Sequence, residues 1–553
     1  MDELTQQTTE VLVIGAGPIG LFAAFLLGKL GIPTLVIEKY KARRGQPKAH
    51  ALNPRTLEIF RQCGLDTQKL RSMGADPHGV DRVRFMDRFA GWEFGSLPYE
   101  RQFEDVLNVT SEPLFNVAQP LVEDFLAEYL QRMDRVAVKS PVTWLEATED
   151  QFGNIISTVL DRESGNRSQI SSRFLIACDG ARAISRQQLG IPFQLLHDKA
   201  TEKHYVTVHF KADLSNFRTG ILFFLMQPYG LVTFICYDRK KDWVFVFRYN
   251  PEETPASHFT PDECYRRVQD ALGSTEVSLK LLSTTIWSTT PRLADKYRSG
   301  RIPNAFLAGD AAHTFSPTGG LGVNTGFGDV HNLVWKIHAV REGRAPSTLL
   351  DSYGMERRPV AQANAAQSTV NEENIAHLGR LVASHGRETW ATAEFRGEIE
   401  AAIANNADHF DSLDLQLGAN YAGQQRDPGK DVSAFIPCCT PGYRLPHAWV
   451  DRKGERISCL DLIVVGLAWT VLSPSAEASR RVTAGLDPRF SSMVLVQEMG
   501  VDFGSADQDW ISMVFPRDEA VLVRPDQHVA ARVSSPRGLE QALATGLRDG
   551  MPQ

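Results

Sequence analysis

The hydrophobic positions at the start of the chain follow the order strand, helix, strand. Residues 10–14 form a short apolar run typical of a buried strand, and residues 34–37 form a second one rich in β-branched side chains. Between them, residues 19–30 are apolar and helix-like until Gly31-Ile-Pro33 ends the run. The pattern predicts a β-α-β unit at the start of the chain.

Further patterns divide the rest of the chain. Helices are predicted over residues 55–63, 119–130 and 325–340, with helical patterns to about residue 407, and buried strands over 173–178 and 305–308. Residues 136–170 alternate between polar and apolar positions, and residues 202–249 contain several apolar runs of strand length. Both patterns indicate antiparallel strands. Residues 420–447 are rich in Gly, Pro and Gln, as in a linker. After them, short strands at 462–465, 470–472, 493–498 and 520–523 alternate with helices, which predicts a small α/β domain.

Composition narrows the protein class. The 553 residues correspond to roughly three to four domain-sized units. With 59 basic and 66 acidic residues, the net charge of −7 suits a soluble protein and gives no broad footprint for nucleic acid. The polar, acidic first ten residues do not resemble a secretory signal, and glycines, prolines and a lysine interrupt the apolar stretch 11–37, so no transmembrane segment is expected. We therefore expect a cytoplasmic protein.

The seven cysteines include no C-x-x-C, which disfavours a disulfide scaffold, a structural zinc site and thiol–disulfide catalysis. Cys438 and Cys439 are adjacent, and two free thiols are expected there rather than a strained vicinal disulfide. No cluster of metal ligands stands out among the 14 scattered histidines.

Gly15, Gly17 and Gly20 form G-x-G-x-x-G between the first predicted strand and helix, with Pro18 inside the turn. Gly15 allows the tight turn, Gly17 lets the backbone approach a pyrophosphate, and Gly20 lets the helix pack closely on the strand. Glu38 ends the next strand, 18 residues past Gly20, where a carboxylate can accept ribose hydroxyls, and Lys39 follows it. This order predicts dinucleotide binding. The alternative is a tight helix–strand contact without a ligand, and the motif alone does not separate NAD(P) from FAD.

Two later motifs make the comparison specific. The sequence 179–186, DGARAISR, follows a buried strand and resembles the DG motif of flavoprotein aromatic hydroxylases. The sequence 308–336, AGDAAHTFSPTGGLGVNTGFGDVHNLVWK, resembles their GD motif and its helix, and the segment LLDSYGMERRPVA that follows also matches. The chain thus resembles, over nearly its whole length, the class A FAD-dependent, NAD(P)H-using monooxygenases of the phenol hydroxylase type. It departs at Ala183, Leu321 and Val330, where the family favours serine, glutamine and alanine; none of these removes a proposed ligand.

The resemblance implies an α/β architecture. A Rossmann-like FAD-binding domain of the GR2 type would span residues 1–410, interleaved with an antiparallel substrate sheet from about 80–115 and 195–295. Residues 411–447 would be a linker and 448–553 a thioredoxin-like domain that packs or forms a dimer contact. Trp449, Trp469 and Trp510 are expected in its core, and a homodimer is possible.

The resemblance also implies which residues hold the cofactor. Asp310 would bind the ribityl hydroxyls of tightly bound FAD, and Pro317 would begin the turn beside the flavin. Gly320, Gly322, Val323 and Asn324 would bring backbone N–H groups to the flavin N1–C2 carbonyl edge at the start of a helix. Arg55 and Gln119 match positions that contact the FAD phosphates and ribityl chain; a surface ion pair and a helix cap are the alternatives. Asp179 and Arg182 belong to the motif linked to FAD and to NADPH or NADH, although a structural role is open for both.

Hydroxylation in this family proceeds through a C4a-hydroperoxyflavin formed with O2, and an ionised phenol attacks its electrophilic oxygen far better than a neutral one. A general base near the substrate is therefore useful. His50, five residues before Arg55, is the first candidate, with a loop hydrogen bond as the alternative. Asp213 is a second, weaker candidate, for which a solvated turn is the alternative. Arg218, Tyr237 and Arg248 lie in or near the expected substrate sheet without a basis for choosing among them.

We therefore expect a monooxygenase that hydroxylates a small phenolic or polyketide-like aromatic substrate. Phe223, Phe224, Phe234 and Phe247 suit an apolar pocket, although about half of such a set should face elsewhere. The same flavin chemistry could instead give epoxidation, Baeyer–Villiger insertion or oxidative dearomatisation. A non-catalytic dinucleotide-binding protein is the alternative of another class. His313, next to the GD motif, is expected to be a structural neighbour of the cofactor rather than a base.

Overall fold

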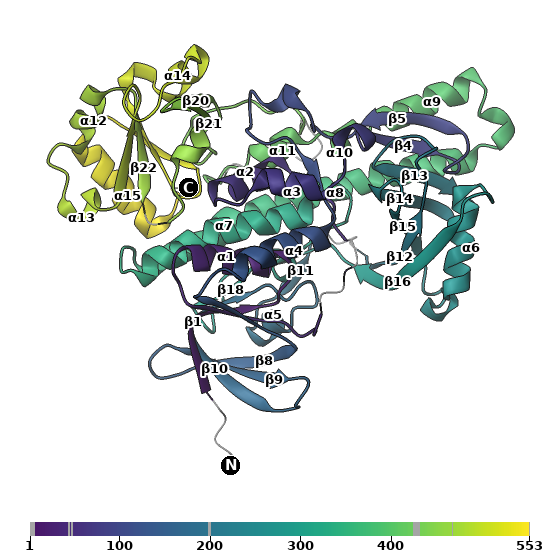
Figure 1. Ribbon diagram of the computed structural model, residues 1–553, viewed down its shortest axis with the longest axis horizontal. Coiled ribbons are helices and arrows are strands. Elements are labelled where there is room, and N and C mark those ends of the chain that lie inside the picture. Colours follow the sequence, from purple (N-terminus) through teal and green to yellow (C-terminus); the bar gives the residue numbers. More distant parts are fainter. Residues whose placement is uncertain are drawn as a thin grey trace.

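The computed structural model describes residues 6–42, 45, 48–196, 201–423, 432–466 and 468–551. Within these residues the chain forms two seven-stranded sheets, a four-stranded sheet near the C-terminus and three smaller sheets. In Figure 1 the C-terminal sheet and the second large sheet lie at opposite ends of the molecule, with the first large sheet and helix α7 (Leu321–Arg341) between them. None of the helices in the described part is long and apolar enough to cross a membrane.

The first sheet contains the predicted β-α-β unit. Its order is β7-β2-β1-β10-β9-β8, with β18 beside β10; β7, β2, β1, β10 and β18 are parallel neighbours, whereas β9 and β8 run antiparallel. The strands are β1 Gln6–Ile14, β2 Thr34–Ile37, β7 Val136–Lys139, β8 Val142–Glu149, β9 Ile155–Asp161, β10 Arg167–Ala177 and β18 Ala305–Leu307. Helix α1 (Pro18–Lys29) packs against α4 (Gln119–Leu130) and α7, so its apolar residues join one core with β1 and β2.

The second sheet has the order β16-β12-β15-β14-β13-β4-β5 and is antiparallel except for the β13–β4 pair. Its strands are β4 Arg82–Met86, β5 Glu93–Pro98, β12 Lys203–Ala212, β13 Leu222–Gln227, β14 Gly230–Asp238, β15 Asp242–Tyr249 and β16 Leu279–Thr289. Alternate residues such as Val206, Phe234 and Phe245 share a core with Val268 and Leu272 of α6 (Pro261–Leu272). The other face of the sheet is left for a cavity.

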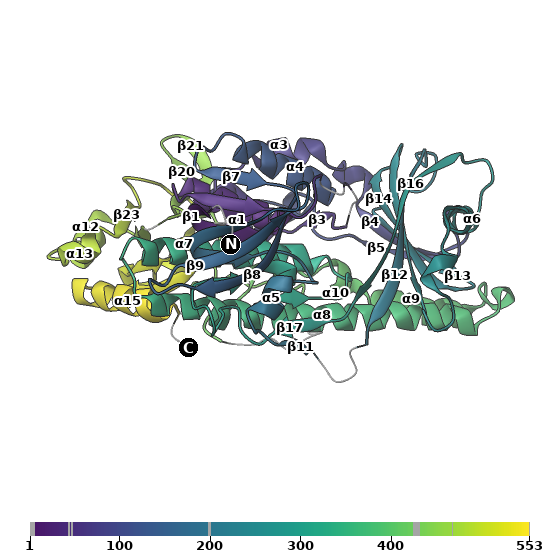
Figure 2. The same cartoon turned by 90° about the horizontal axis from the view of Figure 1, so that it is seen from below.

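Helix α8 (Asp351–Ser384) connects the regions around the two large sheets. Its early residues pack against α7, and its later residues lie against β13 and β14. Figure 2 shows it running along one side of the molecule from the first sheet towards the second. Because β4, β5 and β12–β16 lie in sequence between strands of the first sheet, the two sheets are interleaved along the chain.

The glycine-rich segment before α7 differs from the sequence prediction. The helix was predicted from residue 325, but it begins at Leu321, directly after Gly320, whose φ of 62° is left-handed. Gly322, Gly326 and Gly328 disfavour a helix by intrinsic propensity. Tertiary packing overrides this, since a Cβ on Gly326 would lie 2.7 Å from Ile19 Cδ1 and one on Gly328 would lie 2.7 Å from Arg357 Nη2. Close contact with α1 and α8 therefore accounts for those two glycines in the helix.

The C-terminal region is a mixed sheet of order β23-β22-β24-β25 with helices packed on it. Strands β22 (Trp469–Ser473) and β23 (Val494–Glu498) are parallel, whereas β24 (Ala520–Val523) and β25 (Val529–Val533) are antiparallel to their neighbours. Its helices are α12 Ala476–Thr483, α13 Pro488–Ser491, α14 Gln508–Val514 and α15 Pro536–Asp549. The strand predicted at 462–465 is absent from the described residues; a 3-10 turn, Cys459–Leu462, stands there, capped at its start by Ser458.

The remaining elements are short. They comprise α2 Pro54–Gln62, α3 Thr67–Met73, α5 Ile184–Gln188, α9 Ala393–Ala404, α10 Ala407–Phe410, α11 Leu413–Leu417, and the strands β3 Ala51–Leu52, β6 Phe115–Asn116, β11 Phe193–Leu195, β17 Arg292–Ala294, β19 His313–Thr314, β20 Trp449–Arg452 and β21 Glu455–Ser458. The segment expected to be a linker contains α11 and buried residues, among them Tyr421, Arg444 and Leu445, so its described part is packed against the rest of the chain.

Candidate active site

Three distant motifs meet at one edge of the first sheet. Strands β1, β10 and β18 are adjacent and parallel, and Ile14 pairs with Ala177, which pairs with Leu307. The residues that follow these strand ends begin the G-x-G-x-x-G, DG and GD segments. Carboxyl ends of parallel strands are where ligands bind in open α/β sheets. The fold thus brings together motifs that the sequence separates by almost 300 residues.

The first motif forms a turn with space left at the start of a helix. Gly15 has a φ of +99°, and a Cβ there would lie 2.5 Å from the carbonyl oxygen of Cys178. A Cβ on Gly20 would lie 1.9 Å from the carbonyl oxygen of Gly15, whereas one on Gly17 would meet nothing within 4 Å. Gly17 is the N-cap of α1 and Pro18 its first residue. Gly15 and Gly20 therefore permit the packing, and Gly17 leaves room where a helix N-terminus favours an anion.

Carboxylates surround this turn. Glu38 accepts hydrogen bonds from the backbone N–H groups of Ala16 and Tyr40, both at 2.9 Å, which fixes its carboxylate beside the turn. Lys39 lines the same cavity. Asp179 accepts from the Ser185 hydroxyl at 2.7 Å and from its N–H at 3.2 Å, and burial raises the pKa of Asp179. Arg182 is exposed at the cavity wall. Each carboxylate oxygen has lone pairs beyond these bonds, so both groups can still accept from a ligand.

Asp310 and the start of α7 form the next part of the cavity wall. The Asp310 carboxylate is accessible from the cavity, and no described side chain or backbone group hydrogen-bonds to it. The surrounding protein atoms raise the pKa of Asp310 by desolvation. Pro317, Gly320, Gly322 and Val323 also line the cavity. Because Gly322 and Val323 lie in the first turn of α7, their N–H groups have no helical acceptor and can bind a ligand oxygen.

Gln119 lines the cavity at the first turn of α4, where its amide donates to Glu123 at 2.7 Å. Arg55 does not line it. Its guanidinium donates to Gln527 Oε1 at 2.6 Å and to the Asp526 carbonyl at 2.9 Å, so the prediction of an FAD contact is wrong for this side chain. Arg55 instead joins α2 to the C-terminal region, because acceptors there satisfy its guanidinium.

The side chain of Asn324, in the first turns of α7, joins this helix to β3. Its side chain accepts from the Asn53 N–H at 3.0 Å and donates to the Ala51 carbonyl at 3.0 Å, which fastens α7 to β3. It is buried outside the cavity lining, and as the fourth helical residue its own N–H falls where intrahelical bonds begin. The side chain of Asn324 is therefore structural, and a flavin contact of its backbone N–H stays a prediction, as it does for Gly322 and Val323.

Asp213 is a solvated turn residue. It follows β12, accepts from the Ser215 N–H at 3.0 Å and hydroxyl at 2.5 Å, and lies outside the cavity. The hydrogen bond from the Ser215 hydroxyl lowers the pKa of Asp213, which makes it a weaker base. The prediction that Asp213 is catalytic is therefore wrong, and the alternative of a turn aspartate is correct.

His50 lines the cavity, and a chain of amides fixes its tautomer. Gln102 donates through Nε2 to the carbonyls of Val80 and Tyr99, so its Oε1 accepts, at 2.8 Å, from Asn116 Nδ2. Asn116 Oδ1 must then accept from His50 Nδ1, 3.1 Å away. This leaves His50 Nε2 as the acceptor nitrogen. Burial lowers the pKa of His50, so the neutral, proton-accepting form is favoured.

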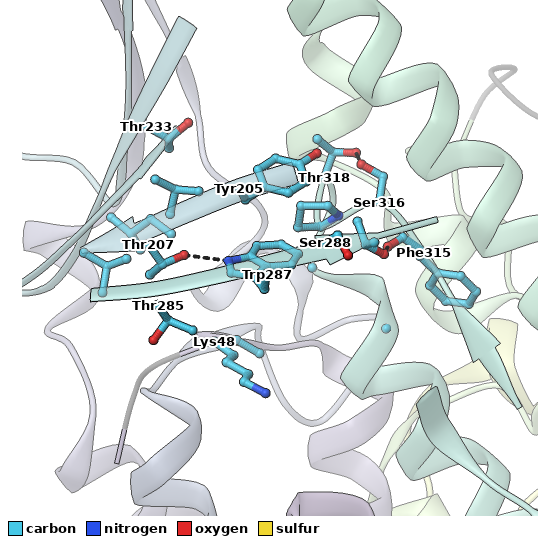
Figure 3. A pocket seen from close by; sticks show the side chains of 18 of the residues that line it. Lys48, Tyr205, Thr207, Thr233, Thr285, Trp287, Ser288, Phe315, Ser316 and Thr318 are labelled. Atoms are coloured by element: carbon cyan, nitrogen blue, oxygen red, sulfur yellow. Dashed lines mark hydrogen bonds between the residues drawn. The ribbon is translucent and has the colours of Figure 1, made fainter. Parts of the chain in front are cut away.

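A single cavity of about 2220 Å³ joins these groups to the second sheet. Cross-strand partners on its cavity face form one complete row across β16, β12, β15, β14 and β13: Thr285, Thr207, Val246, Thr233 and Phe224. Beside it, Trp287 pairs with Tyr205 and Tyr205 with Arg248, while Leu231 pairs with Met226. Polar groups gather on β16 and β12, and apolar ones on β14 and β13. Figure 3 shows Tyr205 and Trp287 between this sheet and the loop of Ser316 and Thr318, with the Trp287 N–H donating to Thr207 at 2.9 Å.

Of the four phenylalanines, Phe224 is on the cavity face of the sheet, whereas Phe223, Phe234 and Phe247 have their side chains on the core face, so part of the set faces elsewhere as expected. His313 is buried and bonds to Asp329 at 2.8 Å, as expected of a structural neighbour. All seven cysteines are free thiols, including Cys438 and Cys439. Sequence reasoning missed several cavity residues from outside the motifs, namely Tyr99, Tyr205, Trp287, Glu372 and His409. The period-2 pattern of β12 and β16 was the only signal that could have found two of them.

Comparisons with known proteins agree with this geometry. The family described as an FAD binding domain matches residues 8–368, and the family described as the C-terminal part of aromatic-ring hydroxylases matches residues 439–549. Aklavinone 12-hydroxylase DnrF of Streptomyces peucetius is 30% identical over 85% of this chain and 92% of its own. Phenol 2-monooxygenase of Pseudomonas sp. (strain EST1001) is 28% identical over 95% of this chain and 90% of its own. The crystal structure of the flavin-dependent monooxygenase PieE, in complex with FAD and substrate, is 26% identical and superposes with a TM-score of 0.89 over 98% of this chain and 99% of its own.

Proposed function

Because the chain belongs to the class A FAD-dependent aromatic hydroxylases, which are flavoprotein monooxygenases, we propose that it uses NADPH or NADH and O2 to hydroxylate a phenolic or polyketide-like aromatic compound. The observation that carries the proposal is the single cavity that runs from the glycine turn to the second sheet. Its volume of about 2220 Å³ exceeds the roughly 300–1,000 Å³ of a pocket for one drug-sized ligand. It therefore suits a large cofactor together with a substrate.

The residues at the first end of the cavity fit FAD. The open space at Gly17 suits the pyrophosphate, and Glu38 lies where a ribose would be bound. The Asp310 carboxylate has no hydrogen-bond partner among the described residues and can accept from hydroxyl groups such as those of a ribityl chain. The first-turn N–H groups of Gly322 and Val323 would face the flavin carbonyl edge. When bound, FAD accepts electrons from the nicotinamide and activates O2 to supply one oxygen atom.

The substrate end supplies a base and a shaped wall. His50 would accept the proton of the substrate hydroxyl at Nε2, since Asn116 holds the other ring nitrogen as a donor. Loss of that proton makes the ring electron-rich and ready to attack an electrophilic oxygen. The sheet orients the ring by placing polar groups on the β12–β16 side and apolar groups on the β13–β14 side. A polycyclic substrate with one oxygenated edge would match this division.

We also propose that the C-terminal region is thioredoxin-like. Support comes from two parallel strands, β22 and β23, followed by the antiparallel β24 and β25 in the order β23-β22-β24-β25. With no C-x-x-C in the sequence, this region packs rather than catalyses thiol exchange. Trp469 and Trp510 are buried in it, whereas the Trp449 N–H donates to the Leu107 carbonyl at 2.9 Å. A homodimer stays a prediction that sedimentation would check.

The test is turnover of the purified holoenzyme. We expect a yellow protein with a flavin spectrum, and phenols and hydroxyanthraquinones that stimulate NAD(P)H oxidation with formation of a product one oxygen atom heavier by mass spectrometry. The structure of the product separates hydroxylation from epoxidation, ring insertion and dearomatisation. NAD(P)H oxidation that yields only peroxide with every aromatic compound, or a protein that cannot be loaded with flavin, would overturn the proposal.

A further inference from the structure

Among the described residues, the Arg248 guanidinium of the second sheet has no hydrogen-bond acceptor. Arg248 lies on β15, lines the cavity, and its side chain is 53% exposed. Its closest charged neighbour is Glu372 of α8, whose Oε1 is 3.6 Å from Nη1, which is beyond hydrogen-bond range. Lys203 instead binds Oε2 of the same carboxylate at 2.5 Å. Within the described part of the chain, the Arg248 guanidinium thus has only this long ion pair, and its N–H groups have no hydrogen-bond acceptor.

The structure distinguishes Arg248 from the two residues that the sequence could not separate from it. Arg218 forms an ion pair with Glu93 at 2.7 Å and does not line the cavity. Tyr237 does not line it either, and its hydroxyl is buried without a partner among the described residues. Of these three, only Arg248 presents a polar group to the cavity.

Two aromatic side chains beside Arg248, Tyr205 and Trp287, stack on each other, and we call this stacked pair the aromatic wall. Tyr205 is its cross-strand partner on β12, and Trp287 is the partner of Tyr205 on β16. The rings of Tyr205 and Trp287 stack with centroids 4.5 Å apart and an interplanar angle of 16°. Directly opposed side chains on one face of a sheet have Cβ atoms about 4.5–5.5 Å apart. Since Arg248 is directly opposite Tyr205, an aromatic ring packed against this pair would bring a substituent within reach of the Arg248 guanidinium.

This wall is next to the loop that begins α7. The Thr289 hydroxyl, two residues past Trp287, donates to the Phe315 carbonyl at 3.4 Å. On the other side, Asn371 Nδ2 would lie 3.0 Å from a Cβ on Gly319, and Glu372 follows Asn371 on α8. Figure 3 shows the rings of Tyr205 and Trp287 beside Ser316 and Thr318 of the same loop. A ring on this wall is therefore close to the place proposed for the flavin.

We propose that Arg248 binds an anionic oxygen of the aromatic substrate, either a phenolate or a ring carboxylate, while the stacked Tyr205 and Trp287 support the ring that bears it. The inference rests on the proposed function, since it places an aromatic substrate in this cavity. The planar guanidinium can give two parallel N–H···O bonds to such an oxygen group, and charge-assisted bonds of this type are strong. An anionic oxygen near the oxygenated edge also keeps the ring electron-rich.

The test compares three tricyclic probes of matched shape by equilibrium dialysis with the FAD-loaded enzyme: anthraquinone, anthraquinone-2-carboxylate, and 2-hydroxyanthraquinone at a pH where its phenol is ionised. We expect wild type to bind the anionic probes more tightly than anthraquinone. Arg248→Met should weaken their binding about 10- to 100-fold and leave anthraquinone within about twofold. If Arg248→Met loses affinity for both anionic probes, Arg248 binds anionic oxygens in general. If it loses affinity for the carboxylate alone, the site is specific for a carboxylate.

The matched control is Arg218→Met, because the Arg218 side chain is 48% exposed, close to the value for Arg248, yet lies outside the cavity. It should bind all three probes as wild type does. Arg248→Gln, which retains donors but not the charge, should show the same loss and replaces the methionine variant if that one does not hold FAD. If wild type and both Arg248 variants prefer the anionic probes over anthraquinone to the same extent, the anion site at Arg248 would be overturned, while binding of aromatic compounds in the cavity would remain supported. Failure of wild type to bind any probe would overturn the proposed function with it.

Discussion

Arg524 donates to both carboxylate oxygens of Glu356, at 2.7 and 2.8 Å, and both side chains are buried. Glu356 belongs to α8 and Arg524 to the C-terminal region, so the bond joins the two. Lys336 and the Met551 N–H also donate to this carboxylate, at 2.7 and 3.0 Å. Burial alone would raise the pKa of Glu356, but Arg524 and Lys336 hold it at about 2.

Replacement of Arg524 by methionine should destabilise the protein strongly. The negative charge of Glu356 then stays buried with fewer positive partners. Removing one partner of a buried ion pair costs about 3–5 kcal/mol of folding stability. Denaturant unfolding measures the loss. Arg548→Met is the control, because Arg548 and Asp549 form an exposed pair with 66% and 46% side-chain exposure, which solvent screens, so its loss should change stability little. Equal stability losses in the two variants would contradict the importance of the buried pair.

Alanine at Gly17 and at Gly20 should have opposite consequences. Gly17→Ala adds a methyl where no protein atom lies within 4 Å, so folding should be unchanged while FAD affinity falls at least tenfold through crowding of the phosphates. Gly20→Ala places a methyl 1.9 Å from the Gly15 carbonyl oxygen and should lower the melting temperature of the apoprotein itself. Thermal melts and FAD titration of both apoproteins separate the effects. Normal FAD affinity in Gly17→Ala would argue against the proposed phosphate site.

Loss of the Asp310 carboxylate should reduce FAD retention. Its acceptor oxygens are accessible from the cavity and have no partner among the described residues, so Asp310→Ala should remove bonds to the ligand without breaking any of those seen within the protein. The visible absorbance of the purified variant, relative to protein, should fall several-fold while its unfolding midpoint as apoprotein stays constant. Asp213→Ala, a change at an exposed turn, should retain full flavin. Unchanged flavin content in Asp310→Ala would remove it from the cofactor site.

His50→Ala should slow hydroxylation more at low than at high pH. Burial lowers the pKa of His50 below its usual value of 6.5, so wild type keeps its base as the pH falls towards neutrality and loses it only below that range. Without the imidazole, the rate depends on spontaneous phenol ionisation and should rise up to tenfold per pH unit until the phenol is ionised. Single-turnover rates across pH provide the measurement, with Asp213→Ala expected to follow wild type. A His50→Ala profile parallel to wild type would exclude His50 as the base.

The sequence was sufficient for the parts of the site built from local backbone geometry. The turn from Gly15 to Gly20, the strand ending before Asp179 and the helix start at Gln119 depend on short-range rules, and the structure has them within a few residues of the predicted bounds. His50 was also placed correctly in the cavity. However, the tautomer of His50 is set by its hydrogen bond to Asn116, which in turn bonds to Gln102. These two residues lie in another strand and a loop, so the sequence near His50 could not predict it.

Side chains whose direction depends on distant partners were beyond the sequence. The Arg55 side chain hydrogen-bonds to Gln527, 472 residues away, and the Asn324 side chain hydrogen-bonds to the residue after β3. A match to a family position therefore did not establish the direction of either side chain. Likewise, Arg248 could not be preferred over Arg218 until the sheet register showed which one faces the cavity. The prediction of a strand at 462–465 was also wrong. Ser458 and Asp461 form a capping box that starts a 3-10 turn there, and the apolar residues alone gave no sign of it.

The two faces of the second sheet have a consequence for changing what the enzyme accepts. Along β12 the cavity residues Tyr205 and Thr207 alternate with the core residues Val206 and Val208, and β14 alternates in the same way. A substitution on the cavity face therefore changes the shape of the cavity wall that contacts a bound substrate and leaves the core packing on the other face almost intact. None of these positions belongs to the glycine turn or the aspartate motifs. The cavity-facing positions of these strands can therefore be changed one at a time, and a library confined to them could redirect selectivity while the proposed FAD site is kept unchanged.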